Sequence, residues 1–196
     1  MEEENKPVKG AESILIHNGN IVLGMQTPNR WYTLEDGTKA GIIKTIGGKI
    51  EKEDNGSSRN AVQREIIEEI EGINKENLKI STKPVFSKNI RLGDLNPFQK
   101  DSKLGLTADF YVAGITKEGN LKPNDLPAIF EIPIEQFMKM NFGCKDYLRF
   151  LNKYITKNEK MYQDIELPES YAMMIPGEVK TFFRELTKND GRWISG

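Results

Sequence analysis

The sequence predicts a mixed α+β domain that ends near residue 140, followed by a helical C-terminal extension. Three observations lead to this prediction. Short runs rich in β-branched residues recur between turn residues, one capped amphipathic helix lies in the first half of the chain, and the apolar spacing becomes helical after residue 140. With 196 residues, of which 37% are hydrophobic, the chain has enough apolar material for one packed core.

The first strands are expected to form a β-hairpin. Residues 13–17 and 21–25 are apolar runs on either side of Asn18-Gly19-Asn20, a turn sequence that favours positive φ angles. The polar residues 1–10 before the hairpin predict a flexible lead, and the polar segment 27–40 after it predicts a loop. Four more strands are expected, at 41–46, 78–87, 107–115 and 130–133.

An amphipathic helix is expected over residues 58–71, between two of these strands. Ser57 or Ser58 can accept a hydrogen bond from its first turn, and Gly72 can adopt the left-handed conformation that ends a helix. The apolar stripe of this helix consists of Val62, Ile66 and Ile70. A second helix is expected at 134–140.

The chain divides into three predicted parts. Residues 1–10 form the lead, 11–140 the α+β domain and 141–196 the extension. Within the extension, helices are expected at 144–156 and 177–186, where apolar residues recur with helical spacing. An amphipathic helix must bury its apolar side against the domain or against a second copy of the chain, so a homodimer is one prediction for this segment.

Composition excludes several classes of function. The chain has 28 Lys and Arg and 29 Asp and Glu residues, a net charge of 28 − 29 = −1, so no general nucleic-acid binding is expected. A single cysteine, Cys144, excludes an internal disulfide, and a single histidine excludes a His-rich metal site. Any metal ion must then be held by oxygen ligands, which favours Mg²⁺ or Mn²⁺ over Zn²⁺. We expect the histidine, His17, at the surface beside the hairpin turn.

A soluble, cytoplasmic location is expected. No apolar run approaches the roughly 18 residues that a membrane span requires. The first residues are acidic, and no apolar signal region follows them.

The clearest chemical signal is a cluster of three carboxylates. Glu65, Glu68 and Glu69 are spaced i, i+3 and i+4, so they share one helix face. They repel one another, and they lie at the C-terminal end of the helix, where the helix dipole already places partial negative charge. A solvated acidic helix end is the plain explanation for this segment alone. A bound Mg²⁺ would compensate the charge and explain the pattern better.

These residues are part of a longer pattern that resembles the Nudix hydrolase signature: Gly, five residues, Glu, seven residues, then Arg-Glu, an apolar residue, any residue, Glu-Glu, any residue and Gly. Gly47 and Gly48 open the run Gly-Gly-Lys-Ile-Glu, which many members share, and residues 64–69 match the core at every position. The resemblance covers about residues 11–140. It implies an α/β/α sandwich in which a mixed sheet lies between helices.

The signature is longer here in two places. The loop between Gly48 and Arg64 has two more residues than the pattern, so the first signature Glu is absent at its strict position and Asp54, Glu53 and Glu51 are the candidate substitutes. The exit of the helix is one residue longer. Both changes lie at helix ends, where changes in length are best tolerated, and both leave the carboxylate face intact.

The resemblance also implies a role for each signature residue. Glu65, Glu68 and Glu69 would bind Mg²⁺, or Mn²⁺ in its place, together with the carbonyl of Gly47. Arg64 would orient the carboxylates through charge-assisted hydrogen bonds. Glu65 would assist the attacking water. The implied catalytic residues are therefore Arg64, Glu65, Glu68 and Glu69.

Three further residues are candidate substrate contacts. Gly48 lets a ligand approach the backbone closely. Trp31 could stack on a base, with ordinary packing as its alternative role. Asp125 lies just before the closing strand, where family members often carry a further acidic ligand, and Glu118 is the second choice for that role.

The resemblance implies Mg²⁺-dependent hydrolysis of a nucleoside diphosphate linked to another moiety, by attack of a metal-activated water on phosphorus. The substrate would be a small nucleotide: a nucleoside triphosphate, a dinucleotide or an ADP-ribose type. The signature does not separate these, because it binds only their common diphosphate. One alternative is a Nudix-like domain that binds a nucleotide without turnover. Another is an RNA-end hydrolase, against which the lack of excess basic charge weighs.

Overall fold

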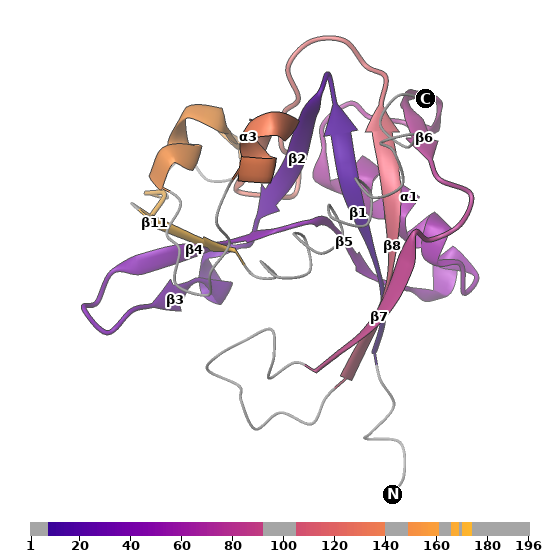
Figure 1. The fold of residues 1–196 in the computed structure, drawn as a ribbon, viewed down its shortest axis with the longest axis horizontal. Coiled ribbons are helices and arrows are strands. Elements are labelled where there is room, and N and C mark those ends of the chain that lie inside the picture. The colour runs from indigo at the N-terminus through magenta and orange to yellow at the C-terminus, as the bar shows by residue number, and fades with distance from the viewer. Residues whose placement is uncertain (1–7, 92–104, 140–148, 161–165, 169, 174–196) are drawn as a thin grey trace, which may run out of the picture.

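The computed structural model describes residues 8–91, 105–139, 149–160, 166–168 and 170–173 (Figure 1). The strands in these residues belong to one mixed sheet, whose central order is β10-β9-β2-β1-β8-β6. Among the described residues, no helix has the length and apolar character that a membrane crossing requires.

The centre of the sheet is the predicted hairpin of β1 (Val8–His17) and β2 (Asn20–Met25). Asn18 and Gly19 have φ angles of 47° and 76°, so the turn has the positive φ angles that its sequence favours. β8 (Gly105–Ile115) pairs in parallel with β1, and β9 (Ala128–Pro133) pairs antiparallel with β2. The prediction of a mixed sheet is confirmed.

The predicted strand at 41–46 is part of two strands that pair with different partners. β4 (Lys39–Lys44) pairs with β2, and β5 (Ile46–Lys49) pairs with β1. Thr45 lies between the two strands. Because β5 pairs with β1, the glycines of β5 lie directly against β1. The remaining strands are β3 (Tyr32–Thr33), β6 (Leu78–Ile80), β7 (Phe86–Arg91), β10 (Ile155–Lys157) and β11 (Ser170–Met173).

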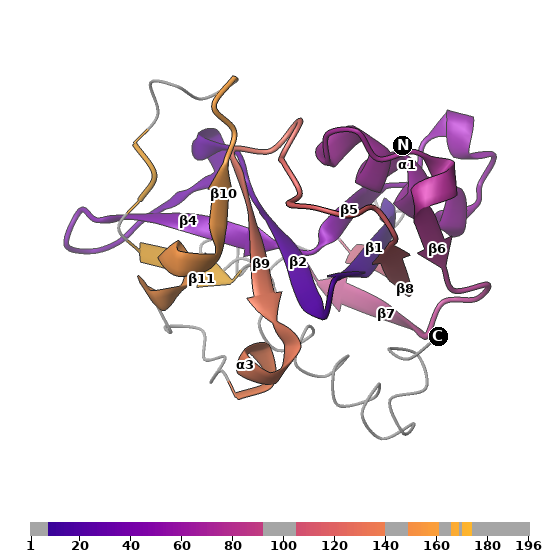
Figure 2. The same cartoon turned by 90° about the horizontal axis from the view of Figure 1, so that it is seen from above.

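Alternate residues of the central strands point to opposite faces of the sheet and form two cores. α1 (Ser58–Glu69) covers one face, where Val62 and Ile66 pack against Leu15. α3 (Ile134–Lys139) contributes Phe137 to the other core, which contains Ile14. Figure 2 shows the two helices on opposite sides of the sheet. This arrangement confirms the α/β/α sandwich.

α1 begins as the sequence predicts but ends two residues early. The side chain of Ser57 accepts a hydrogen bond from the backbone N–H of Asn60, at 3.2 Å. After Glu69, Ile70 adopts an extended conformation and forms a bridge with Pro123. Gly72 has a φ angle of 71°, but it lies in the turn beyond the helix. The predicted capping role of Gly72 is therefore wrong.

Two expectations near the hairpin are also corrected. β1 begins at Val8, so residues 8–10 belong to the sheet and not to a flexible lead. His17 is buried: its Nδ1 lies 2.6 Å from Glu131 Oε1 and its Nε2 lies 2.9 Å from the carbonyl oxygen of Lys117. A residue beside a turn becomes buried here because β9 and the chain after β8 lie against it.

The described part of the extension contains a 3₁₀ helix and two strands in place of the predicted α-helical structure. Residues 149–154 form a 3₁₀ helix, and β10 follows where the helix over 144–156 was expected. β10 pairs with β9, and β11 pairs with β4, so both strands complete the sheet. Leu151 is fully buried, which explains an apolar spacing that resembles a helix. The expected helix at 177–186 lies outside the described residues.

Asn158 connects the extension to the loop before β9. It is buried, and its side-chain amide donates to the carbonyl oxygens of Leu126, at 3.0 Å, and Asn124. Its backbone N–H donates to the carbonyl of Pro127, at 2.9 Å. The extension therefore holds the loop 121–127, which in turn contacts the end of α1.

Replacement of Asn158 by Ala is expected to lower the free energy of unfolding by about 1–3 kcal/mol, because it leaves two carbonyl groups without a donor. Urea denaturation followed by circular dichroism measures this loss. Lys157→Ala is the control, since Lys157 is an exposed neighbour on β10 and its loss should cost less than about 0.5 kcal/mol. Equal stability of the two variants would contradict the role of Asn158.

Candidate functional site

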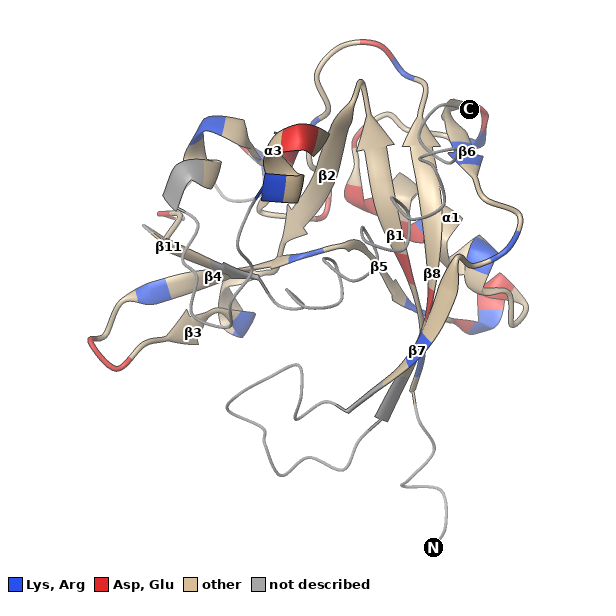
Figure 3. Ribbon diagram, in the orientation of Figure 1, with Lys and Arg blue, Asp and Glu red and all other residues tan. Residues whose placement is uncertain are grey.

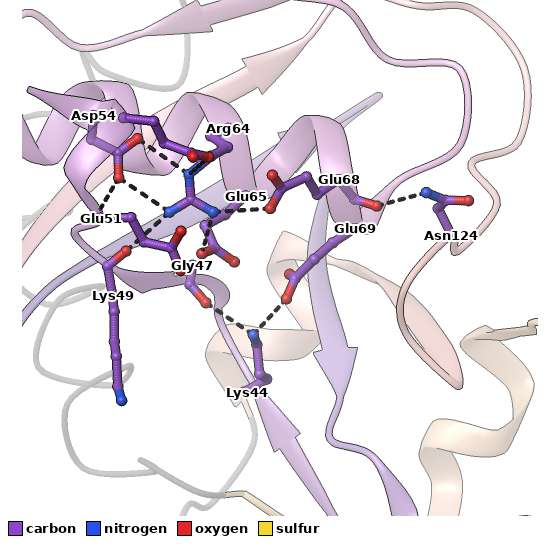
Figure 4. Close-up of polar contacts among 11 residues, drawn as sticks. Lys44, Gly47, Lys49, Glu51, Asp54, Arg64, Glu65, Glu68, Glu69 and Asn124 are labelled. Carbon is purple, nitrogen blue, oxygen red and sulfur yellow. Dashed lines mark hydrogen bonds and ion pairs between the residues drawn. The ribbon is translucent and has the colours of Figure 1, made fainter.

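The guanidinium of Arg64 organises the acidic end of α1 (Figure 4). Its Nη1 donates to Glu65 Oε1 and Glu68 Oε2, both at 2.9 Å. Its Nε and Nη2 donate to the two carboxylate oxygens of Asp54, at 3.2 and 3.1 Å. Nη2 also donates to the carbonyl of Lys49, at 3.0 Å. One side chain thus joins two helix carboxylates to the loop before the helix and to β5.

Of the acidic residues in the loop before α1, Asp54 makes the bidentate contact with Arg64. The longer loop forms a 3₁₀ helix, Lys52–Asp54, that brings this carboxylate to Arg64, and Asp54 is 2% exposed. Asp54 Oδ2 also accepts from the N–H of Glu51, at 2.8 Å. Burial acts to raise the pKa of Asp54, but the hydrogen bonds from Arg64 and Glu51 outweigh it and lower the pKa. Glu53 is exposed and lies 3.6 Å from Arg64 Nε.

The two glycines let α1 lie directly on β5. A Cβ atom at Gly48 would collide with the carboxylate of Glu65. A Cβ atom at Gly47 would lie 2.7 Å from the Cα atom of Glu12 on β1. A larger residue at Gly48 would push Glu65 away from the β5 backbone, and one at Gly47 would push β5 away from β1.

A second cation, Lys44, holds the most buried of the three helix glutamates. Its Nζ donates to Glu69 Oε1 at 2.7 Å and to the carbonyl oxygen of Gly47 at 2.9 Å. Sequence analysis missed this residue. The available signal was a lone lysine directly after the apolar pair Ile42-Ile43 and just before the glycines.

The three glutamates differ in exposure. The exposed fractions of their side chains are 9% for Glu69, 15% for Glu65 and 46% for Glu68. Burial raises the pKa of Glu69 to about 7, although Lys44 opposes this, and burial also raises the pKa of Glu65. Burial acts to lower the pKa of Lys44, but the charges of Glu69 and Glu12 outweigh it and raise the pKa.

The loop 121–127 supports the end of α1 through Asn124. The backbone N–H of Asn124 donates to the carbonyl of Glu69, and its side-chain amide donates to the carbonyl of Glu68, both at 2.8 Å. These are carbonyls that the end of a helix leaves without a helical partner. Its neighbour Asp125 is exposed, as is Glu118. A ligand role for Asp125 stays a prediction, and the contact with α1 is made one residue earlier.

Trp31 is not brought to the carboxylates. It precedes β3, which lies at the opposite side of the molecule from α1 in Figure 1. Its indole N–H donates to the carbonyl of Gln26 at 2.6 Å, and its ring packs against the core that contains Phe137. These contacts support a packing role, and stacking on a base stays a prediction.

The predicted metal ligands therefore lie together, but cations already hold their oxygens. Figure 3 shows the acidic positions of α1 beside the sheet. As the side chains lie, no three acidic, His or Cys side chains in the described part of the chain form a group able to hold a metal ion. Arg64 binds Glu65 and Glu68, and Lys44 binds Glu69 and the carbonyl of Gly47. Glu69 Oε2 is buried and has no hydrogen-bond partner among the described residues.

Comparison with known proteins identifies the fold. No protein-family model matches the sequence, and no curated protein is recognisably similar to it. Among solved structures, a Caenorhabditis elegans Ap4A hydrolase binary complex is 11% identical, with a TM-score of 0.52 over 94% of this chain and 98% of that one. The chain has the Nudix fold.

Other solved structures match a smaller share of the chain. The MutT protein from Methanosarcina mazei Go1 is 18% identical, with a TM-score of 0.49 over 70% of this chain and 85% of that one. A NUDIX family hydrolase from Clostridium perfringens is 14% identical, with a TM-score of 0.45 over 69% of this chain and 87% of that one. At such identities a shared Nudix fold says nothing about individual residues, so the chemistry must be argued from the site itself.

Removal of the Asp54 carboxylate should be costly, because it leaves the half-enclosed Arg64 without its bidentate partner. We expect Asp54→Ala to lower the free energy of unfolding by about 2–4 kcal/mol. Glu53→Ala removes an exposed carboxylate next to it and should cost less than about 0.5 kcal/mol. Urea denaturation at pH 7.5 compares the two variants, and equal losses would show that Asp54 has no special role.

The raised pKa of Glu69 predicts a pH dependence of stability in EDTA. The folded protein keeps a proton on Glu69 up to about pH 7, whereas the unfolded chain releases it near the ordinary value of 4.5. Stability should therefore fall as the pH rises from 5 to 7 and then level off. The pKa of Asp54 is lowered, so its titration changes the stability only below its ordinary pKa of 3.8, outside this window.

Chemical denaturation at several pH values between 5 and 8 measures this dependence. The variant Glu69→Gln lacks the titrating group, so its stability should fall less over the same window than that of the wild type. Parallel curves for the two proteins would mean that Glu69 titrates alike in the folded and unfolded states.

Proposed function

We propose that this chain is a hydrolase that cleaves the diphosphate linkage of a nucleoside diphosphate joined to another moiety, with Mg²⁺ or Mn²⁺ as cofactor. The observation that carries the proposal is the network around Arg64. It holds carboxylates of successive turns of α1 against the glycine backbone of β5, on a fold shared with an Ap4A hydrolase. A packed protein surface does not need such a concentration of like charge.

The donor set suits a hard divalent cation. Glu65, Glu68 and Glu69 offer carboxylate oxygens and Gly47 offers a carbonyl oxygen, which are the ligands that Mg²⁺ prefers. The buried Glu69 Oε2 has no partner among the described residues, so a cation would satisfy it. When bound, the ion would neutralise charge on the diphosphate and lower the pKa of a water molecule.

The protein groups then have separate tasks. Arg64 holds Glu65 and Glu68 in fixed orientations, and Asp54 fixes Arg64 from the opposite side. Glu65 is suited to take a proton from the attacking water, because burial raises its pKa toward the working pH. The water oxygen bonds to phosphorus, the bond from phosphorus to the bridging oxygen breaks, and the bridging oxygen leaves with the second product. Asn124 keeps the end of α1 in place throughout.

The substrate class is proposed at the level of the diphosphate. The similarity to an Ap4A hydrolase covers nearly the whole of both chains, which favours a dinucleotide as the first compound to test. Nucleoside triphosphates and ADP-ribose carry the same linkage. The alternative is a domain that binds a nucleotide without turnover. The presence of all three helix glutamates favours the enzyme. A homodimer and a cytoplasmic location stay predictions.

Product release from a panel of nucleotides with Mg²⁺ tests the proposal. The panel contains Ap4A, ADP-ribose and nucleoside triphosphates. We expect Glu65→Gln and Glu68→Gln to lower kcat by about 10²-fold or more, since each removes a charged ligand. The matched control is Glu71→Gln, because Glu71 lies just beyond α1 and pairs with Lys160, outside the network.

Each outcome decides between the alternatives. Full activity in both variants would contradict the assignment of the carboxylate face. Tight nucleotide binding by the wild type without turnover of any compound would favour the binding domain. If Glu71→Gln lost as much activity as Glu65→Gln and Glu68→Gln, the loss would be a general effect of charge at the helix end.

A further inference from the structure

Lys44 lies where two of the proposed metal ligands meet. Its Nζ bonds both the carbonyl oxygen of Gly47 and Glu69 Oε1, at 2.9 and 2.7 Å. Its side chain is 11% exposed, so this is an enclosed contact and not a surface ion pair. Figure 4 shows the ammonium between these two oxygens, on the side of the carboxylate cluster opposite Arg64.

The charges around Lys44 come from three elements. Glu69 and Glu65 face it from α1, and Glu12 faces it from β1. The Arg64 guanidinium lies on the far side of Glu65 and binds Glu65 and Glu68 instead. The two cations therefore bind different carboxylates. Arg64 binds Glu65 and Glu68, whereas Lys44 binds Glu69 and the carbonyl oxygen of Gly47.

We infer that Lys44 is an internal cation that competes with the divalent metal ion for Glu69 Oε1 and the carbonyl oxygen of Gly47. The inference rests on the proposed function, since it concerns the same metal ligands. An ammonium and a metal ion held by the same carboxylate and the same carbonyl oxygen lie close together and repel each other strongly in an enclosed site. A metal ion bound there requires the ammonium to move, which the flexible four-carbon stem of lysine permits.

This competition has two consequences for the protein. Lys44 holds the most buried of the three helix glutamates when no divalent ion is bound, and because it bonds both α1 and β5 it stabilises their packing. It also weakens metal binding, because part of the binding free energy is used to break two hydrogen bonds of an enclosed ammonium. Removal of the ammonium should therefore tighten metal binding and weaken the fold at the same time.

Isothermal titration with Mn²⁺ alone, without nucleotide, measures the effect of Lys44 on metal binding. We expect Lys44→Met, which keeps an unbranched side chain of nearly the same length but removes its charge, to lower the Kd by about tenfold or more. Lys44→Gln serves as a second variant in case the Met variant does not fold. The control is Lys49→Met, because Lys49 has an exposed side chain that points away from the cluster in Figure 4. It removes one positive charge nearby without touching Glu69.

Thermal unfolding with and without Mn²⁺ measures the effect of Lys44 on the stability of the fold. In EDTA, Lys44→Met should have a lower Tm than the wild type, and saturating Mn²⁺ should raise its Tm by more than it raises that of the wild type. A purely structural lysine would instead lower the Tm equally under both conditions and leave the Kd for Mn²⁺ unchanged.

The results separate this inference from the proposed function. If wild type, Lys44→Met and Lys49→Met bind Mn²⁺ with the same Kd, the competition is disproved and the metal site stands. If the Lys49→Met control tightens binding as much as the Lys44 variants, the effect is one of general charge, and the competition is disproved as well. If none of the proteins binds Mn²⁺, both the competition and the proposed metal site fail.

Discussion

The arrangement of the site depends on the hydrogen bonds of one guanidinium group. The end of α1 carries carboxylates that repel one another and also face the negative end of the helix dipole. Arg64 reaches two of them, together with Asp54 and the carbonyl of Lys49. Only the planar, five-donor group of arginine can serve so many acceptors in different directions, because a lysine ammonium has three donors at a single point.

The backbone around this group is held from two sides. On one side, β5 pairs with β1, and its glycines allow the carboxylates to lie against the main chain. On the other side, Asn124 binds the last carbonyls of α1, and Asn158 binds the loop that carries Asn124. Segments more than one hundred residues apart in the sequence thus determine the position of the same helix end.

The charge balance of the cluster explains why a divalent ion suits it. In the described part of the chain, six carboxylates face two cations there, Arg64 and Lys44. The carboxylates are those of Glu12, Glu53, Asp54, Glu65, Glu68 and Glu69. The excess negative charge is partly enclosed, and burial raises the pKa of Glu69 and Glu65 accordingly. A cluster with this balance attracts cations, and the two protein cations already limit where a further one can bind.

The sequence by itself determined the local features of this protein. The Asn-Gly turn, the Ser57 cap and the short strand-forming runs of β1 and β8 depend on neighbouring residues, and so does the shared helix face of the three glutamates. Each could be predicted because turn geometry, capping and periodicity act over a few residues. The Nudix signature likewise placed the candidate site on α1 and β5.

Only the tertiary structure decided which distant groups meet. Among three acidic residues of one loop, Asp54 became the partner of Arg64, because the 3₁₀ helix turned that carboxylate inward. Lys44 and Asn124 reached the site through strand pairing and loop packing, which local sequence does not fix. The extension became strands where its spacing suggested a helix, because the open edges of β9 and β4 offered backbone partners. Long-range hydrogen bonding outweighed local preference at each of these places.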